Sequence, residues 1–127
     1  MESNKRITDI VQVNRSPFGA PYVFVLAVIK GHDQHVCLRL TQKETTIGAD
    51  PDLADLALRD NQISNRHLLV RINGNMVSII DLESTNGTVL NKNKISSGKP
   101  HRLKHLDEIQ IGRNRLLFMA CRFHQDT

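Results

Sequence analysis

The chain has 127 residues, of which 39% are hydrophobic and 24% are charged, and it carries a net charge of +4 at pH 7. This length and composition are typical of one soluble globular domain with a core of its own, rather than of a disordered or multidomain chain. The longest apolar run, residues 22–29, is too short to cross a bilayer, and no signal-type segment follows the polar N-terminus, so we expect a cytoplasmic protein.

The N-terminal residues 1–17 carry no clear hydrophobic period and are half polar, which is typical of a flexible leader. The folded domain is expected to cover residues 18–124, followed by a short tail at residues 125–127. Some apolar residues of the leader could still dock onto the domain: Ile7, Ile10, Val11 and Val13.

Short runs rich in β-branched and apolar residues follow along the remaining chain, separated by turn residues every few positions. In one of these runs Val36, Leu38 and Leu40 alternate with other residues and therefore share one face of a strand. No helical period of useful length and no repeat occurs, so the sequence predicts an all-β sandwich of two sheets. The expected strands cover residues 22–29, 35–40, 45–48, 56–58, 67–72, 76–82, 108–111 and 115–121.

Cys37 and Cys121 both lie in apolar strand-like runs. Cysteines of a chain kept in a reducing compartment remain thiols. We therefore expect two buried free thiols rather than a disulfide.

The runs at residues 67–72 and 76–82 are joined by an Asn-Gly pair, which is a strong signal for a hairpin. A type I′ turn is expected there, with a positive φ at both central residues. Because the strands of a hairpin are antiparallel, the start of the first lies beside the end of the second. Ser64 and Thr85 are therefore expected at one edge of one sheet.

Two polar corners flank this hairpin: the first corner spans residues 63–67 and the second corner spans residues 84–88. Ser64 offers a hydroxyl, Asn65 a side-chain amide and Thr85 a second hydroxyl, which together can hold a tetrahedral oxyanion without a metal. Each corner alone is also ordinary turn chemistry, since Ser, Asn and Gly are common turn residues. Considered separately, the corners leave both a ligand site and a structural turn open.

Several blocks follow one another through the chain: Thr46-Ile47-Gly48, Ile63-Ser64-Asn65-Arg66-His67, Ser84-Thr85-Asn86-Gly87-Thr88, Asn91, and Ile109-Gln110-Ile111-Gly112. In this order and at this spacing they resemble the forkhead-associated (FHA) domain. The resemblance covers roughly residues 22–123, which is nearly the whole chain. It implies a two-sheet β-sandwich of the FHA (SMAD/FHA-like) type, whose loops at one end bind phosphothreonine peptides.

By this resemblance, Ser64, Asn65 and Thr85 are the candidate donors to a phosphate group. A phosphothreonine brings close to two negative charges and three acceptor oxygens. Asn86 is expected to hold the peptide backbone beside the phosphothreonine, using its amide donor and its carbonyl acceptor together. His67 is expected to brace the two corners rather than to act as a titrating catalyst. The motif residues with a structural role are then Gly48, His67 and Gly87.

The sequence departs from the family pattern at Ala49, where the family has an arginine after the glycine. That arginine is a charge-assisted phosphate donor, and losing a contact of roughly 1.5–3 kcal/mol would weaken binding ten- to a hundredfold. A second departure is Leu106, where the family usually has a glycine; a leucine argues against a tight turn with positive φ. The cations nearest in sequence that could replace the arginine are Arg59, Lys92 and Lys94.

Other classes of function find little support in the residues. No nucleophile, base and orienting group occur together in a suggestive context, so neither an enzyme nor a catalytic residue is predicted. His101 and His105 would share a face only on a helix, which Pro100 and the following strand pattern oppose, so no metal or cofactor is expected. Nucleic acid and membranes are not expected partners, since the chain has five aromatic residues and no stacking motif.

A basic stretch at residues 99–105 contains Lys99, Arg102 and Lys104 as well as two histidines. It is expected to be a solvated loop, or a loop that attracts acidic residues flanking a phosphosite. The sequence gives no indication of the oligomeric state.

Two functions therefore stay open. The first is an adaptor in Ser/Thr-kinase signalling that binds a phosphothreonine-containing protein or peptide. The second is a phosphate-independent interaction or oligomerisation module, which the alanine at position 49 keeps open. A further hypothesis is that phosphorylated Thr8 in the leader acts as the chain's own ligand.

Overall fold

The structure is a computed structural model, and it describes residues 22–122. The expected leader at residues 1–17, with its Thr8, and the expected tail at residues 125–127 lie outside the described residues. The described part contains two β-sheets and no helix, so the predicted all-β sandwich is confirmed.

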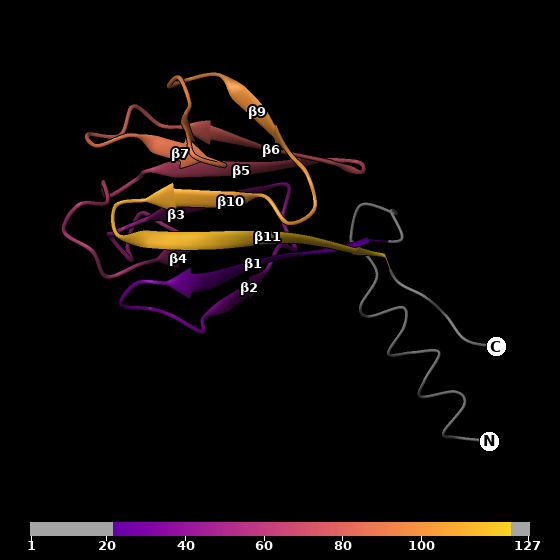
Figure 1. Cartoon of the computed structure of the whole chain (residues 1–127), viewed down its shortest axis with the longest axis horizontal. Coiled ribbons are helices and arrows are strands. Elements are labelled where there is room, and N and C mark those ends of the chain that lie inside the picture. Colours follow the sequence, from indigo (N-terminus) through magenta and orange to yellow (C-terminus); the bar gives the residue numbers. More distant parts are fainter. Residues whose placement is uncertain (1–21, 123–127) are drawn as a thin grey trace.

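The strands of residues 22–122 form two sheets that pack face to face (Figure 1). One sheet has six strands in the order β2-β1-β11-β10-β7-β8, and the other has five in the order β4-β3-β5-β6-β9. Paired strands are antiparallel except β3 and β4, which are parallel. The strands are β1 (Tyr22–Lys30), β2 (Cys37–Arg39), β3 (Glu44–Gly48), β4 (Leu56–Ala57), β5 (Leu68–Asn73), β6 (Met76–Asp81), β7 (Thr88–Leu90), β8 (Asn93–Lys94), β9 (Pro100–Leu103), β10 (Glu108–Ile111) and β11 (Asn114–Arg122).

The core is formed by every second residue along the strands. β1 buries Phe24, Leu26 and Val28 on its inner face, and its neighbour β11 buries Leu116 and Phe118. Leu26 lies opposite Phe118 in the register, and Val28 lies opposite Leu116. Because every second side chain of a strand points to the same face, apolar residues from both sheets fill one shared core.

The predicted hairpin is formed by β5 and β6, but its turn differs from the prediction. Gly74 and Asn75 are the central residues, and of the two only Gly74 has a positive φ, at +63°. A glycine with positive φ at the first central position is typical of a type II′ turn rather than type I′. The register still places Leu68 opposite Asp81, so both corners begin at the same edge of the sheet.

The connecting loops gather at the two ends of the sandwich (Figure 1). The loop end, on the left of the view, holds the connections between β3 and β4, β4 and β5, β6 and β7, and β10 and β11. The opposite end, on the right, holds the turn between β5 and β6 and the turn between β9 and β10. Both polar corners therefore lie at the loop end.

Both cysteines are exposed, so the prediction of two buried thiols was wrong. Cys37 lies opposite Ala27 of β1, and Cys121 lies opposite Val23 of β1. These β1 residues alternate with the inward-facing Phe24, so both thiols lie on the outer face of the six-stranded sheet. An apolar strand does not reveal which of its faces is covered, and both cysteines are free thiols.

Leu106 has a φ of +71°, so the prediction that a leucine would prevent a positive-φ turn was also wrong. The Leu106 N–H donates to the Phe118 carbonyl at 2.7 Å, and the Asp107 N–H donates to the Lys104 carbonyl at 3.0 Å. The Asp107 carboxylate accepts the Lys104 N–H at 2.7 Å in return. These bonds hold a conformation that costs a non-glycine residue about 1–2 kcal/mol.

Candidate functional site

The first corner packs closely against the end of β3. The Ala49 N–H donates to the Ser64 carbonyl at 3.0 Å. This bond holds the first corner beside the end of β3. A Cβ atom on Gly48 would lie 2.0 Å from the carbonyl oxygen of Asn65. The φ of Gly48 is not positive, so this glycine is required for the close approach of two backbones rather than for an unusual conformation.

The side chain of His67 connects the two corners. Its side chain is fully buried, its Nδ1 accepts the Ser64 N–H at 3.2 Å, and its Nε2 lies 2.8 Å from the Gly87 carbonyl oxygen. A backbone N–H can only donate and a carbonyl can only accept, so the ring is neutral and carries its proton on Nε2. Burial lowers the pKa of His67 below its usual value, which keeps the ring in that form.

Asp81 holds the second corner in shape. This buried carboxylate accepts the Ser84 hydroxyl at 2.6 Å, the Thr88 hydroxyl at 2.6 Å and the Ser97 hydroxyl. Burial alone would raise the pKa of Asp81, but hydrogen bonds from Ser84, Ser97 and Thr88 lower it to about 2. The Ser84 hydroxyl in turn accepts the Gly87 N–H at 2.9 Å, which fixes the path of the corner.

Ser64 and Thr85 meet at the loop end. The Thr85 N–H donates to the Ser64 Oγ at 3.0 Å, which leaves the hydroxyl proton of Ser64 free for a ligand. Among residues 22–122, no hydrogen-bond partner engages the Asn65 side chain or the Thr85 hydroxyl, and both residues are exposed. The arrangement therefore offers three side-chain donors to solvent on two adjoining corners, as an anion requires.

Asn86 links the corners a second time. Its Nδ2 donates to the Gln62 carbonyl at 3.0 Å, so one of its two amide protons is used within the protein. The second amide proton and the side-chain carbonyl are left for a ligand. Asn86 is therefore held in place at the edge of the site while keeping one donor and one acceptor.

The three candidate cations lie in different surroundings. Arg59 is tied to Asp33, with its Nε at 3.1 Å and its Nη2 at 3.0 Å from one carboxylate oxygen. The Arg59 N–H also donates to the second oxygen of Asp33 at 2.7 Å. A guanidinium that donates two N–H groups to a carboxylate oxygen has less of its charge available for a phosphate.

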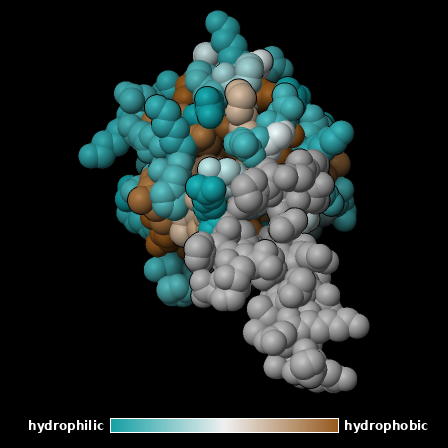
Figure 2. All heavy atoms as spheres, turned by 90° about the vertical axis from the view of Figure 1, so that its right-hand side faces the viewer, coloured by the Kyte–Doolittle hydropathy of each residue, from teal (hydrophilic) through white to brown (hydrophobic). Residues whose placement is uncertain are grey.

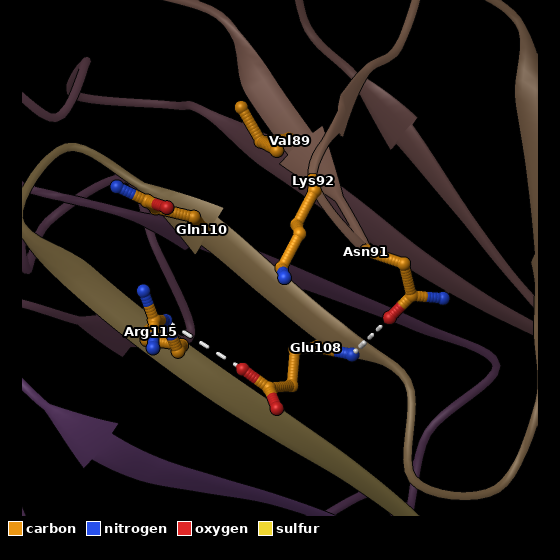
Figure 3. A pocket seen from close by; sticks show the side chains of 6 residues that line it. All are labelled: Val89, Asn91, Lys92, Glu108, Gln110 and Arg115. Atoms are coloured by element: carbon orange, nitrogen blue, oxygen red, sulfur yellow. Dashed lines mark hydrogen bonds and ion pairs between the residues drawn. The ribbon is translucent and has the colours of Figure 1, made fainter.

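Lys92 lies on the outer face of the six-stranded sheet. It lines a pocket of about 290 Å3 and reaches over β10 between Gln110 and Glu108 (Figure 3). Arg115 of the same pocket pairs with Glu108 at 3.6 Å. This pocket contains neither Ser64 nor Thr85 and belongs to the sheet surface.

Lys94 lies against the second corner. A Cβ atom on Gly87 would come within 2.6 Å of the Lys94 Cε and 3.3 Å of its Nζ. Gly87 has a φ of +84°, so a side chain there is disfavoured both by conformation and by the lysine. Of the three candidates, Lys94 is the cation whose charge lies on a corner of the motif.

Across the described residues, no group of three or more His, Cys, Asp or Glu side chains is arranged to hold a metal ion. The same part of the chain has no helix long and apolar enough to span a membrane.

We expect the free energy of unfolding to fall in two steps as the pH is lowered. The first begins near pH 6.5, because the unfolded chain binds a proton at His67 while burial holds the folded-state pKa lower. The second runs from about pH 3.8 to about 2, where Asp81 is protonated only in the unfolded chain, and it removes about 2 kcal/mol. Urea unfolding followed by circular dichroism across this range measures both steps.

The variant His67→Asn is the control for the first step, because asparagine does not titrate. Its unfolding free energy is expected to change little around pH 6 while the second step persists. An equally large first step in this variant would assign that step to another group.

The sequence model of the FHA domain matches residues 45–112. An oxoglutarate dehydrogenase inhibitor from Corynebacterium jeikeium is 37% identical over 102 residues, which are 80% of this chain and 68% of that protein. The chain spans between 57% and 68% of the length of the curated relatives compared with it.

Solved structures agree with this match. The FHA domain of the CT664 protein from Chlamydia trachomatis has a TM-score of 0.69 at 30% identity, covering 76% of this chain and 96% of that one. A second structure, solved in a study of phosphothreonine-dependent FHA domain interactions, has a TM-score of 0.67 at 27% identity over 82% of this chain and 99% of that one. Motif order, sandwich topology and these matches agree, and the chain belongs to the FHA domain family.

Proposed function

We propose that this domain binds phosphothreonine-containing peptides through Ser64, Asn65 and Thr85. The observation that carries the proposal is the hydrogen bond of 3.0 Å between the Thr85 N–H and the Ser64 Oγ, which brings the backbone of Thr85 to the Ser64 hydroxyl. With its oxygen accepting from Thr85, Ser64 is oriented to donate outward to a phosphate oxygen. Asn86 then holds the peptide backbone with its free donor and acceptor.

The proposal includes a role for Lys94 as the cation of the site. The family's arginine is absent at Ala49, Arg59 is paired with Asp33, and Lys92 lies on the outer sheet face. The Lys94 ammonium beside Gly87 supplies a positive charge at the second corner. A lysine is a flexible point charge rather than a bidentate fork, so it complements a phosphate with less directional control.

Lys94→Ala is expected to weaken binding of a phosphothreonine peptide by roughly three- to tenfold, because a charge-assisted contact is lost. Lys94→Arg retains the charge and is expected to bind nearly as well as the original chain. Lys92→Ala removes the same charge from the outer sheet face and is the matched control. Fluorescence anisotropy titrations measure all three, and equal losses in both alanine variants would contradict a local role for Lys94.

Ala49→Arg is expected to tighten binding of the same peptide by roughly tenfold. The Ala49 N–H bonds to the Ser64 carbonyl, so a guanidinium added at this position starts beside the first corner. Ala49→Met adds comparable length without charge and is expected to give no gain. A lack of tightening in the arginine variant would mean that position 49 does not face the phosphate.

The central experiment compares matched pools of phosphothreonine, phosphoserine and unmodified peptides by fluorescence anisotropy. The proposal expects binding to the phosphothreonine pool and little or none to the unmodified pool. The alternative function, a phosphate-independent interaction or oligomerisation module, is favoured by Ala49 and expects equal binding to modified and unmodified pools. That second result would overturn the proposed function.

The wider role we propose is an adaptor in Ser/Thr-kinase signalling that acts in the cytoplasm and has no catalytic activity of its own. It is supported by the relative from Corynebacterium jeikeium, an inhibitor of oxoglutarate dehydrogenase, and by the solved FHA domain studied for its phosphothreonine-dependent interactions.

A further inference from the structure

A groove opens at the opposite end of the sandwich, away from both corners. It has a volume of about 470 Å3, and its lining includes Tyr22, Phe24, Phe118 and Ala120. The rings of Tyr22 and Phe24 stack with centroids 6.1 Å apart, and those of Phe24 and Phe118 stack at 6.0 Å. Figure 2 views this end of the molecule and shows apolar atoms between hydrophilic ones. The stack runs from the partly buried ring of Tyr22 at the groove into the core, where Phe24 is 3% and Phe118 is 1% exposed.

The rim of this groove is basic. Its charged lining residues are Arg102 and Lys104, and no acidic residue is among its described lining residues. His105 also lines the groove, and its Nδ1 accepts the Ala120 N–H at 3.1 Å. The nearest acid in sequence is Asp107, whose two oxygens accept the Lys104 N–H at 2.7 Å and an Asn91 amide proton at 2.8 Å. Both donors are uncharged, so Asp107 keeps its negative charge beside the Lys104 backbone. An acidic ligand would meet two exposed cations on the rim, Arg102 and Lys104.

Residues 102–105 of the basic stretch line this groove, whereas Lys99 lies at the end of the sandwich that carries the corners. β9 runs antiparallel to β6, from Pro100 opposite Ile80 to Leu103 opposite Val77. The residues that follow Leu103 therefore lie at the opposite end of the sandwich. Lys104 and His105 are thus distant from the corners, while Lys99, which precedes Pro100, lies at the corner end.

Exposed apolar residues neighbour the groove. Met76 is 47% exposed and sits between two lining residues in the chain, and Leu106 is 56% exposed and follows the lining residue His105. Leu106 also holds its positive φ of +71°, although a glycine would adopt that conformation without strain. Leu106 thus adds exposed apolar surface at the residue that follows the groove lining.

We propose that this groove docks an acidic segment of a partner protein that carries an apolar or aromatic anchor. The anchor side chain packs on Tyr22 and Ala120, and the acidic residues beside it pair with Arg102 and Lys104. Charge complementarity is the reason for this choice of occupant, since the rim is positive and the whole chain carries a net charge of +4. The groove and the corners lie at opposite ends, so both can be occupied at once. This inference does not depend on the proposed phosphothreonine function.

The test uses the full chain and three short fluorescein-labelled peptides. The first surrounds Phe and Leu with Asp and Glu, the second replaces the acids with Lys, and the third replaces Phe and Leu with Ser. Only the first is expected to bind, and in isotope-labelled protein it is expected to shift the amide signals of Tyr22, Phe24 and Ala120. The signals of Ser64 and Thr85 are expected to stay in place.

Lys104→Glu is expected to weaken binding of the acidic peptide about tenfold. Lys43→Glu makes the same change in net charge at an exposed residue that does not line the groove, and it is expected to bind as the original chain does. Ser64→Ala is expected to leave this binding unchanged, which separates the groove from the corners.

Several results would overturn the proposal. Equal binding of the acidic and the lysine peptides would show that the basic rim does not select the ligand. Equal losses of affinity for Lys104→Glu and Lys43→Glu would show that only the net charge of the protein matters. Shifts of the groove signals on deleting residues 1–17, without any peptide, would assign the groove to the chain's own leader. Shifts that depend on protein concentration alone would assign it to a second copy of the chain.

Discussion

Asp81→Ala is expected to lower the free energy of unfolding by about 3–5 kcal/mol. The substitution removes a buried carboxylate that accepts three hydroxyl groups, from Ser84, Thr88 and Ser97. Their protons would be left without an acceptor in a site where Asp81 itself is only 1% exposed. Thr88 is fully buried, so its hydroxyl would be left unpaired where water cannot replace the lost partner, which costs more than the bond contributes.

Urea unfolding at neutral pH measures this loss, with Asp52→Ala as the control. Asp52 is an exposed residue in the turn after β3, and its replacement is expected to change the unfolding free energy by less than about 0.5 kcal/mol. Asp81→Asn keeps the shape of the side chain and is expected to lose less than the alanine variant. Equal stability of Asp81→Ala and the original chain would mean that the second corner does not depend on this carboxylate.

Ser64→Ala is expected to weaken binding of a phosphothreonine peptide by roughly ten- to a hundredfold. A hydrogen bond to a charged phosphate contributes about 1.5–3 kcal/mol, and alanine removes its donor. The substitution also removes the acceptor of the Thr85 N–H, which then turns to water at this exposed position. The loss of affinity is therefore expected without a matching loss of stability.

The control for this variant is Ser78→Ala, which removes a hydroxyl from the middle of β6, away from the corners. Anisotropy titrations of both variants with the phosphorylated and the unmodified peptide separate a phosphate contact from a general effect. If Ser64→Ala binds the phosphorylated peptide as tightly as the original chain does, Ser64 is not part of the site. The proposed function would then lose its basis.

The strands and their pairing could be predicted because their signals are local. A run such as residues 76–82 has its apolar residues at fixed spacing, and an Asn-Gly pair permits a sharp reversal. The antiparallel geometry then places the start of one strand beside the end of the next, so Ser64 and Thr85 could be expected together without any coordinates. β9 (Pro100–Leu103) was not among the expected strands, because it is a short, polar edge strand.

The support beneath the corners could not be predicted. Asp81 closes an apolar strand, and nothing in that pattern shows that three hydroxyls from later segments converge on it. The sequence also could not show which of the two lysines, Lys92 or Lys94, lies at the corners. The two residues are separated by a single position, yet Lys92 reaches over β10 while Lys94 lies against Gly87. Side-chain direction depends on the path of the turn, which sequence spacing does not give.

The sequence alone determined the class of fold, the family and the chemical character of the two corners, because periodicity and turn residues act over a few neighbouring positions. The tertiary structure decided which groups share a site. It joined the corners through His67, placed Lys94 against Gly87 and placed Lys104 and His105 at the opposite end of the sandwich. Such contacts form between residues far apart in the chain, where strand register and burial, rather than local preference, set the distances.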